Sequence, residues 1–376
     1  MPHFADASLV KADNEWSPLR SVIVGRADHT CFPSEREKVI RAIYPKEHIA
    51  HFKPDNPIDP EIVANANQEL DALADLLGKE GMFRFTLPGH NKHPFLTQPN
   101  PWPGITVYRP ETVDWEKFGG YTAAMPRDGL MTVGTHLITA PFAFGCRKHE
   151  IQLAFSPILD KLAEDPRVRV VRRPSLPSPD TVYVEDDDDD AGGSKPSSPW
   201  IINNTRPAFD TADFMRFGKV LLGQHSHVTN QKGIEWLRQS LPEGYTVEII
   251  EGIHDPHAMH IDATIAPLRQ GLLVFNPNKV TEAALRKHAV LRDWELVECP
   301  FQPPPRTWPP RYMSSGWLMM NTLSLDSERV ICEATDTQYI NFLKGLGMKP
   351  IPLPFQHVHS LGGSFHCTTV DLVRED

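Results

Sequence analysis

Short strand-like runs and short helical runs alternate along this chain, and the alternation constrains its fold more than any other feature. The 376 residues include 36 prolines and 23 glycines, which divide the chain into short elements. Runs rich in β-branched and aromatic residues predict strands at 21–25, 130–140, 168–172, 200–203, 246–251, 262–267, 272–276, 317–325, 329–333, 349–354 and 367–372. Apolar residues at helical spacing predict helices at 60–79, 146–164, 211–222, 232–241, 280–288 and 336–346. Interleaved strands and helices predict an α/β fold.

The charge distribution argues against nucleic-acid binding. Hydrophobic residues make up 40% of the chain and charged residues 23%, values typical of globular proteins. One acidic tract, Glu185 to Asp190, supplies six negatives of the net charge of −10, which leaves −4 elsewhere. No basic stripe remains to follow a phosphate backbone. Since glycine, serine and proline follow the tract, we expect 185–199 to be a solvated surface loop in a single catalytic domain spanning 1–376.

No targeting or membrane segment is recognisable. The first residues lack the basic and apolar regions of a secretory signal, and no apolar run approaches the ~20 residues of a membrane span. The cysteines, at positions 31, 146, 299, 332 and 367, are odd in number and form no CxxC pair. Neither a disulfide framework nor a structural zinc site is therefore indicated. We expect a cytoplasmic protein with no membrane partner.

Cys367 follows a pair of adjacent glycines, Gly362 and Gly363, which allow a tight turn and a close approach to the backbone. The alternating residues after the turn place Cys367 in a predicted strand. A thiol there is a candidate nucleophile if a histidine and a carboxylate reach it from elsewhere. Alternatively, Cys367 is a small buried hydrophobe, the commoner role of a lone cysteine.

His260 and Asp262 are the next candidates. If 259–266 form a strand, the two side chains share one face, since residues two apart point the same way. A histidine beside a carboxylate can carry a proton and can anchor a cationic substrate. A polar pair satisfied at a strand edge is an equally good interpretation.

A metal site is a further alternative. His254 and His257 crowd the same segment as His260, and His357 and His359 are expected to share one strand face. Two histidines and a carboxylate can bind zinc or iron. The helical HxxxH spacing is absent, which disfavours this alternative.

Two further carboxylates stand at element boundaries. Asp128 precedes a predicted strand, where a turn can hold its side chain at the mouth of a cleft. Asp210 precedes the predicted helix 211–222, where a capping role is the simpler interpretation.

The chain resembles the amidinotransferases, typified by arginine:glycine amidinotransferase. The matching motifs occur in family order over about residues 12–372: 14–19 (NEWSPL) with 22–25, 124–128 (AMPRD), 209–214 (FDTADF) with 224 and 228–230, 233–236, 259–264 (MHIDAT), 313–317 (MSSGW) and 361–367 (LGGSFHC). Each fragment alone is weak, but the joint match is specific. The resemblance implies a pentein-type fold, a five-bladed, pseudo-symmetric α/β propeller of ββαβ modules.

The resemblance also implies roles for single residues. Cys367 matches the family's nucleophile, His260 its general acid and base, and Asp210 the carboxylate that orients the histidine. Asp128 and Asp262 match the acids that hold the guanidinium. The implied reaction moves the amidino group of L-arginine to an acceptor amine through a covalent amidino-cysteine and releases L-ornithine, with no metal or organic cofactor.

Substrate-binding residues depart from the family in places. Lys279 stands where an arginine commonly grips the donor's carboxylate, and lysine lacks the bidentate fork. Ser315 can assist it, and Met259 lies in the matched motif beside the histidine. His257 replaces the asparagine of the glycine-using members, so the acceptor stays open.

Other functions are possible on the same residues. A guanidine hydrolase of the arginine-deiminase kind shares the propeller and the Cys/His/Asp centre, with water in place of the amine. A non-catalytic binding protein is disfavoured because all five chemical groups are present. The expected partners are small-molecule substrates, and the resemblance makes a homodimer reasonable.

Overall fold

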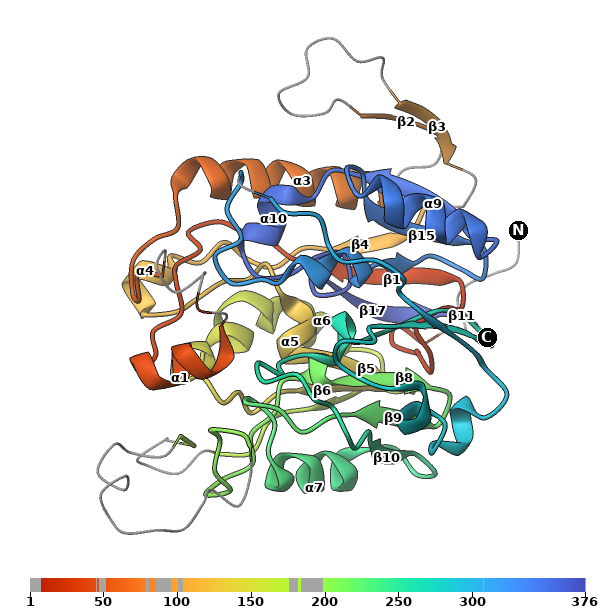
Figure 1. Cartoon of the computed structure of the whole chain (residues 1–376). Helices are drawn as coiled ribbons and strands as arrows, with labels where there is room; N and C mark the ends of the chain where they lie inside the picture. The colour runs from red at the N-terminus through yellow and green to blue at the C-terminus, as the bar shows by residue number, and fades with distance from the viewer. Residues whose placement is uncertain are drawn as a thin grey trace.

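Five three-stranded sheets form the framework of the molecule (Figure 1). The structure is a computed structural model that describes residues 8–44, 46, 52–78, 81–85, 96–100, 104–175, 182–183, 199–306 and 308–375, with the backbone alone for 81–85 and 96–100. The tract expected to be a surface loop, 185–199, lies outside the described residues except for Pro199.

All five sheets share one strand order and one sense. The first strand runs antiparallel to the second, and the second runs parallel to the third. The sheets are β17 (Thr369–Arg374), β1 (Leu19–Val24), β4 (Thr106–Tyr108); β5 (Leu130–Val133), β6 (His136–Thr139), β7 (Arg169–Val171); β8 (Phe214–Phe217), β9 (Val220–Gly223), β10 (Thr246–Ile249); β11 (Ile265–Arg269), β12 (Leu272–Phe275), β13 (Glu295–Glu298); and β14 (Leu323–Ser324), β15 (Arg329–Glu333), β16 (Lys349–Leu353).

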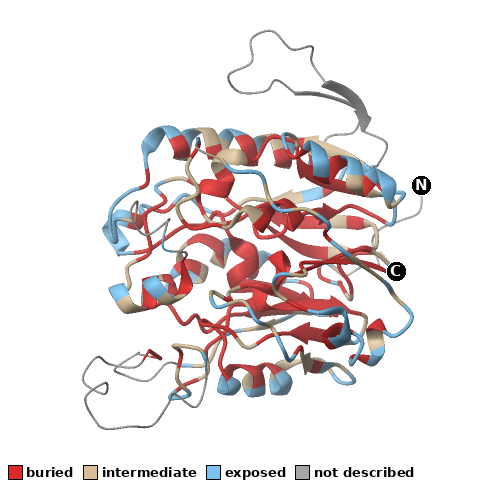
Figure 2. Cartoon of the chain, in the orientation of Figure 1, coloured by how far each residue is buried: buried red, intermediate tan, exposed pale blue. Residues whose placement is uncertain are grey.

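In each sheet the connection from the second strand to the parallel third strand contains an α-helix that crosses over, because parallel strands need a crossover. These helices are α3 (Pro60–Gly78), α6 (Ser156–Leu162), α7 (Gln231–Ser240), α8 (Glu282–Leu285) and α9 (Thr337–Gly345). Figure 2 shows exposed residues on the outer faces of α3, α7 and α9 and buried residues between them. The expected ββαβ propeller is confirmed.

The remaining elements are short and lie between or beside the modules. They are α1 (Glu37–Ile43), α4 (Trp115–Phe118), α5 (Pro126–Gly129), α10 (Gln356–Ser360) and a hairpin of β2 (Gly81–Phe85) and β3 (Leu96–Asn100). None of the helices within the described ranges has both the length and the apolar character that a membrane span needs.

Helix α7 shows how particular residues determine where a helix begins and how closely it packs in its module. The Asn230 side chain caps its first turn by accepting from the Gly233 N–H at 2.8 Å. Ile234 and Leu237 share one buried face with Gly233. A Cβ on Gly233 would lie 2.2 Å from the Ala208 carbonyl oxygen, so only glycine allows the helix to approach this segment.

The last strand closes the ring. β17 pairs with β1 from Val24↔Thr369 to Leu19↔Arg374, so the first sheet joins distant parts of the chain. The first strands β5, β8 and β14 are buried throughout and β11 is buried except for the half-buried Arg269, whereas the third strands β4, β7, β10 and β13 carry exposed residues. The first strands therefore face the centre of the ring, and the segments that lead into them converge there.

Several predicted elements near this centre are wrong. The predicted helix 211–222 is a single 3-10 turn, Thr211–Asp213, followed by the hairpin β8–β9, in which Gly218 turns the chain at φ +69°. Every residue of β8 is buried, including Arg216, and a run that is buried on both faces does not reveal its period.

The segments at His260 and Cys367 also differ from prediction. His260 has φ +63°, and Ile261–Ala263 form a 3-10 helix, so the strand begins only at Ile265. Cys367 lies in the turn before β17 rather than within the strand.

Three further predicted strands differ from the structure. Within 317–325 the first four residues belong to a 3-10 helix, Gly316–Met320, and only β14 is a strand. Ile202 makes only an isolated bridge to Tyr183. His357 and His359 lie on helix α10, not on a strand.

Candidate active site

The predicted chemical groups enter the centre of the ring from four modules. Asp128 precedes β5, Asp210 precedes β8, His260 and Asp262 precede β11, and Cys367 precedes β17. All five are at least nine-tenths buried. The structure thus brings together side chains that are up to 239 positions apart, because each module delivers the turn before its innermost strand to the same axis.

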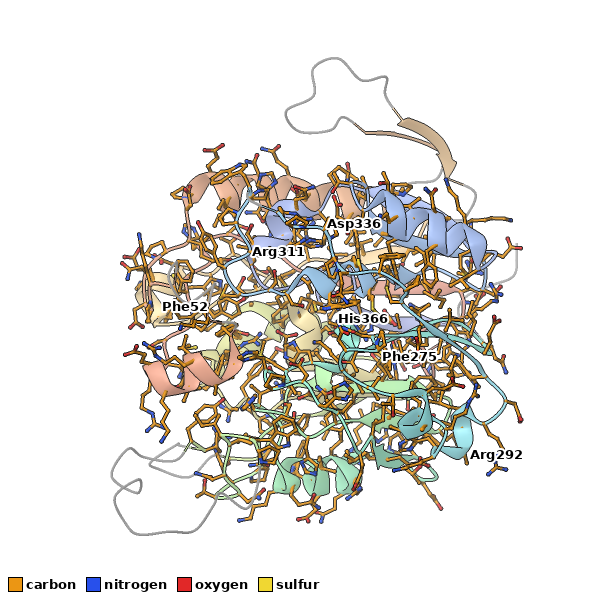
Figure 3. All side chains as sticks on the ribbon, viewed as in Figure 1. Phe52, Phe275, Arg292, Arg311, Asp336 and His366 are labelled. Atoms are coloured by element: carbon orange, nitrogen blue, oxygen red, sulfur yellow. The ribbon has the colours of Figure 1, made fainter. Side chains whose placement is uncertain are left out.

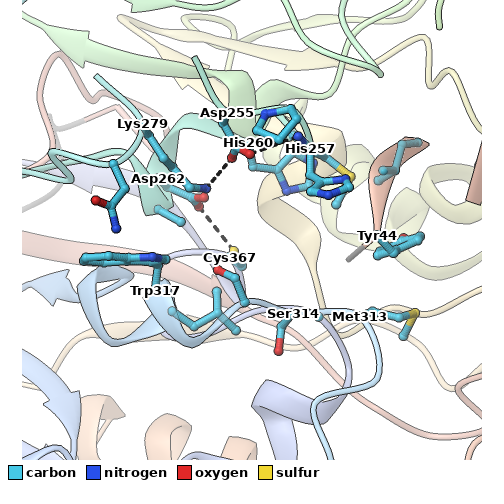
Figure 4. A pocket seen from close by; sticks show the side chains of 18 residues that line it. Tyr44, Asp255, His257, His260, Asp262, Lys279, Met313, Ser314, Trp317 and Cys367 are labelled. Carbon is cyan, nitrogen blue, oxygen red and sulfur yellow. Dashed lines mark hydrogen bonds and ion pairs between the residues drawn. The ribbon is translucent and has the colours of Figure 1, made fainter. Parts of the chain in front are cut away.

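Cys367 donates a hydrogen bond from Sγ to Asp262 Oδ2 at 3.2 Å (Figure 4). Its backbone N–H is fixed by Asn321 Oδ1 at 3.1 Å, an acceptor that also takes the His366 N–H at 3.1 Å. Burial and then the Asp262 carboxylate raise the pKa of the Cys367 thiol to about 12, against a smaller opposing hydrogen bond from His260. At that pKa the thiol is neutral near pH 7.

The turn before Cys367 depends on its two glycines. Gly362 has φ +101°, a conformation that side chains disfavour. A Cβ on Gly363 would lie 2.3 Å from Met125 Sδ and 2.7 Å from Cys367 Cβ. The glycine pair thus sets the position of the sulfur.

His260 lies between two carboxylates. Its Nε2 is 2.9 Å from Asp210 Oδ2, and its Nδ1 is 3.6 Å from Asp128 Oδ1. Burial works against a charged imidazole, but Asp128 and Asp210 outweigh it and raise the pKa of His260 well above its usual value. His260 is therefore a proton donor held in one orientation.

Arg147 completes this side of the site, and sequence reasoning missed it. Its Nη1 donates to Asp128 Oδ2 at 2.9 Å and to Asp210 Oδ2 at 3.4 Å, and its Nε donates to Glu150 Oε2 at 3.0 Å. The guanidinium carbon stacks 4.4 Å from the centre of the Phe142 ring. Arg147 and Glu150 occupy an unremarkable stretch of sequence, so no local signal marks them.

The Arg147 cation also bears on the metal alternative. Possible ligand atoms of Asp128, Asp210 and His260 lie within 4.8 Å of one another. Arg147 Nη1 already occupies the space between the two carboxylates and supplies the positive charge. The histidine cluster does not converge either, because His257 Nδ1 faces the Ala42 carbonyl oxygen.

Asp262 is held from behind by a second buried network. His366 Nδ1 lies 2.9 Å from Asp262 Oδ2, and His366 Nε2 lies 3.3 Å from Glu15 Oε2. Burial would raise the pKa of Asp262, but the hydrogen bond from His366 and its charge lower it to about 2. Glu15 is in turn bound by Arg216, with Nη2 at 2.5 Å from Oε2. Figure 3 shows His366 close to the middle of the molecule.

A cavity of about 220 Å³ opens onto Cys367, His260 and Asp262. Five of the six predicted substrate-binding residues line it, namely Asp262, His257, Met259, Lys279 and Ser315, whereas Asp128 does not. Lys279 Nζ forms an ion pair with Asp255 Oδ2 at 2.8 Å, a partner that the sequence analysis did not consider. In Figure 4 Lys279 and Asp255 lie on one side of Cys367, and Tyr44 and Met313 lie on the other. Asp128 and Asp210 lie behind His260 and are not lining residues.

Comparison with known proteins gives close matches, although no protein-family model matches the chain. An L-arginine:L-lysine amidinotransferase from Pseudomonas savastanoi pv. phaseolicola is 35% identical over 376 residues, which cover 99% of this chain and 96% of the relative. The mitochondrial glycine amidinotransferase of Danio rerio is 34% identical over 391 residues, which cover 98% and 84%. The solved structure of SxtG, an amidinotransferase of the saxitoxin biosynthetic pathway of Microseira wollei, has a TM-score of 0.78 and 30% identity, and covers 98% of both chains.

The fold and the site together define a pentein-type propeller with cysteine, histidine and aspartate at its centre. Relatives above 30% identity match nearly the whole length of this chain. The chain belongs to the amidinotransferase family, as the sequence motifs indicated.

Proposed function

We propose that this protein transfers the amidino group of L-arginine to an acceptor amine through a covalent amidino-cysteine on Cys367, with release of L-ornithine. The observation that carries the proposal is the contact of Cys367 Sγ with Asp262 Oδ2, beside a His260 held by Asp210. The arginine donor is supported by the name of the relative that acts on L-arginine and L-lysine.

The guanidinium binds first and activates the nucleophile. A cation at Asp262 displaces the thiol from Oδ2 and cancels the negative charge that opposes ionisation. Asp128 Oδ1 is buried, lies 3.6 Å from His260 Nδ1 and accepts no hydrogen bond from the described residues, so it retains the capacity to accept a guanidinium N–H. The pKa of Cys367 falls, and the thiol proton leaves to solvent.

The chemistry then follows two matched steps. The thiolate attacks the guanidinium carbon, a C–S bond forms, and the bond to the δ-nitrogen breaks as His260 gives its proton to the departing amine. Ornithine leaves an amidino-cysteine and a neutral His260. The acceptor nitrogen attacks the same carbon, His260 takes its proton, and the C–S bond breaks to restore the thiolate. After the thiol has lost its proton to solvent, Cys367 and His260 handle the remaining proton transfers and electron pairs, so the scheme uses no cofactor.

The small size of the cavity is consistent with a donor and an acceptor that occupy it one after the other. Its volume of about 220 Å³ lies below the ~300–1,000 Å³ of pockets for drug-sized ligands. Because ornithine leaves before the acceptor attacks the amidino-cysteine, donor and acceptor bind in turn, which predicts ping-pong kinetics. His257, Met259 and Ser315 line the space that both share, and Lys279 receives a carboxylate there.

All five cysteines are free. Free thiols support a reducing compartment, and we place the protein in the cytoplasm.

The test is incubation with guanidino-labelled arginine, with and without lysine, glycine and other amines, followed by mass spectrometry of the products and of the intact protein. We expect an amidino adduct on Cys367 without an acceptor, and amine-dependent release of a labelled guanidino product. Cys367→Ser loses both, whereas Cys332→Ser, at a buried thiol on β15, keeps both. Citrulline and ammonia formed without an acceptor would instead show a guanidine hydrolase.

A further inference from the structure

The ion pair between Lys279 and Asp255 lies inside the cavity rather than on the outer surface. The Nζ and Oδ2 atoms are 2.8 Å apart, and each side chain is only 13% exposed. Both residues line the same cavity as Cys367 and Asp262. Two opposite charges are therefore presented side by side to whatever molecule reaches the sulfur.

The pair does not hold its two loops together by itself. The His254 N–H already donates to the Lys279 carbonyl oxygen at 3.0 Å, which joins the loop before His260 to the turn after β12. The turn is fixed independently by the buried Asn276, whose Oδ1 accepts the Asn278 N–H at 3.0 Å. The backbone thus keeps the two charged side chains adjacent without their mutual attraction.

Contacts within the protein fix the positions of the charged groups of Asp255 and Lys279. Asp255 Oδ1 accepts the His257 N–H at 2.9 Å, which leaves Oδ2 for Lys279. Burial would raise the pKa of Asp255, but the Lys279 ammonium outweighs burial and lowers it. Trp317 and Leu318 line the same cavity and offer an apolar surface for a methylene chain.

An α-amino acid carries an ammonium and a carboxylate on one carbon, the complement of this pair. We propose that Asp255 and Lys279 form a clamp for the zwitterionic end of the donor, in which Asp255 accepts from the α-ammonium and Lys279 donates to the α-carboxylate. The inference rests on the proposed function and adds Asp255 as a specificity-determining residue. It also explains how a lysine suffices here: the ammonium contact to Asp255 supplies the second anchor that a single lysine amine lacks.

The test compares three guanidino donors under one acceptor. L-Arginine has both charged groups, 5-guanidinopentanoate lacks the α-ammonium, and agmatine lacks the carboxylate. The assay measures kcat/KM for each donor in the wild type, Asp255→Asn and Lys279→Met. Glu328→Gln is the matched control, because it breaks a Lys–Glu pair at 2.6 Å on the exposed surface, away from the cavity.

The expected result is a change in the ratios of kcat/KM between the donors. Asp255→Asn lowers the preference for arginine over 5-guanidinopentanoate about 10- to 100-fold, the size of one charged hydrogen bond. Lys279→Met lowers the preference for arginine over agmatine by a similar factor, and Glu328→Gln changes neither ratio. The clamp is refuted if Asp255→Asn slows arginine and 5-guanidinopentanoate by the same factor. A wild type that releases no ornithine from arginine refutes the proposed function instead.

Discussion

Replacing Asp262 by asparagine should make Cys367 more reactive and the enzyme less active. Asparagine keeps the shape of the side chain and removes its charge, which lies 3.2 Å from the sulfur. Two negative charges at that distance repel by about 5 kcal/mol at an effective dielectric constant of ~20. This value is an upper bound on the effect of removing the charge. Burial, the larger cause of the high pKa of Cys367, persists in the variant.

We therefore expect the pKa of Cys367 to fall by about one from its value of about 12, which raises the thiolate fraction about tenfold. The assay is the rate of iodoacetamide modification of Cys367 between about pH 6 and 10, without arginine, followed by peptide mass spectrometry. Below its pKa, the thiolate fraction rises tenfold per pH unit in both proteins, and the variant line should lie about tenfold higher. Under the proposed mechanism, turnover of arginine should fall, since the guanidinium loses one of the two acids proposed to hold it.

The prediction is specific because alkylation of Cys367 should become faster while turnover of arginine becomes slower. General loosening of the site would also speed alkylation, so thermal unfolding of both proteins is measured alongside. The reasoning is refuted if a stably folded Asp262→Asn protein is alkylated no faster than the wild type.

Three further predictions concern the support of the site and the core. Asn321→Ala removes the acceptor for the Cys367 N–H, so kcat should fall about 10- to 100-fold with little change in KM in steady-state assays. Gly363→Ala forces the sulfur to move, and the variant should lose at least about tenfold in activity and about 1–3 kcal/mol in urea unfolding. Asp371 pairs with three buried arginines, which outweigh burial and lower its pKa well below the usual value. Its stabilisation is therefore present above about pH 4 and lost in stronger acid, so Asp371→Asn should cost about 3–5 kcal/mol at pH 7 and much less at about pH 2 by urea unfolding.

The module pattern could be predicted from sequence because its signals are local. β12 and β15 are short apolar runs bounded by turn residues, and both appear within one residue of their predicted limits. Local sequence context marked the five chemical groups as candidates, but their roles could be assigned only through the family motifs. Asp210 shows why: its predicted capping role depended on a helix that is instead the hairpin β8–β9.

The groups that support the site could not be predicted, because their signals are not local. His366 meets Glu15 across 351 positions of sequence, and the ring closure that joins them is a property of the whole fold. Arg147 likewise gains meaning only when Asp128 and Asp210 arrive from two modules. Positive φ at His260 depends on the same packing, since nothing in residues 259–264 demands it.

Closure of the ring by β17 determines when, during synthesis of the chain, the site can become complete. Cys367 is the last of the five chemical groups to be synthesised, and it is positioned only when the strand behind it pairs with β1. Before that strand has been synthesised, the nascent chain lacks the thiol on which the proposed mechanism depends. Under that mechanism, activity requires β17 to be paired with β1, so an activity measurement also reports that the ring is closed.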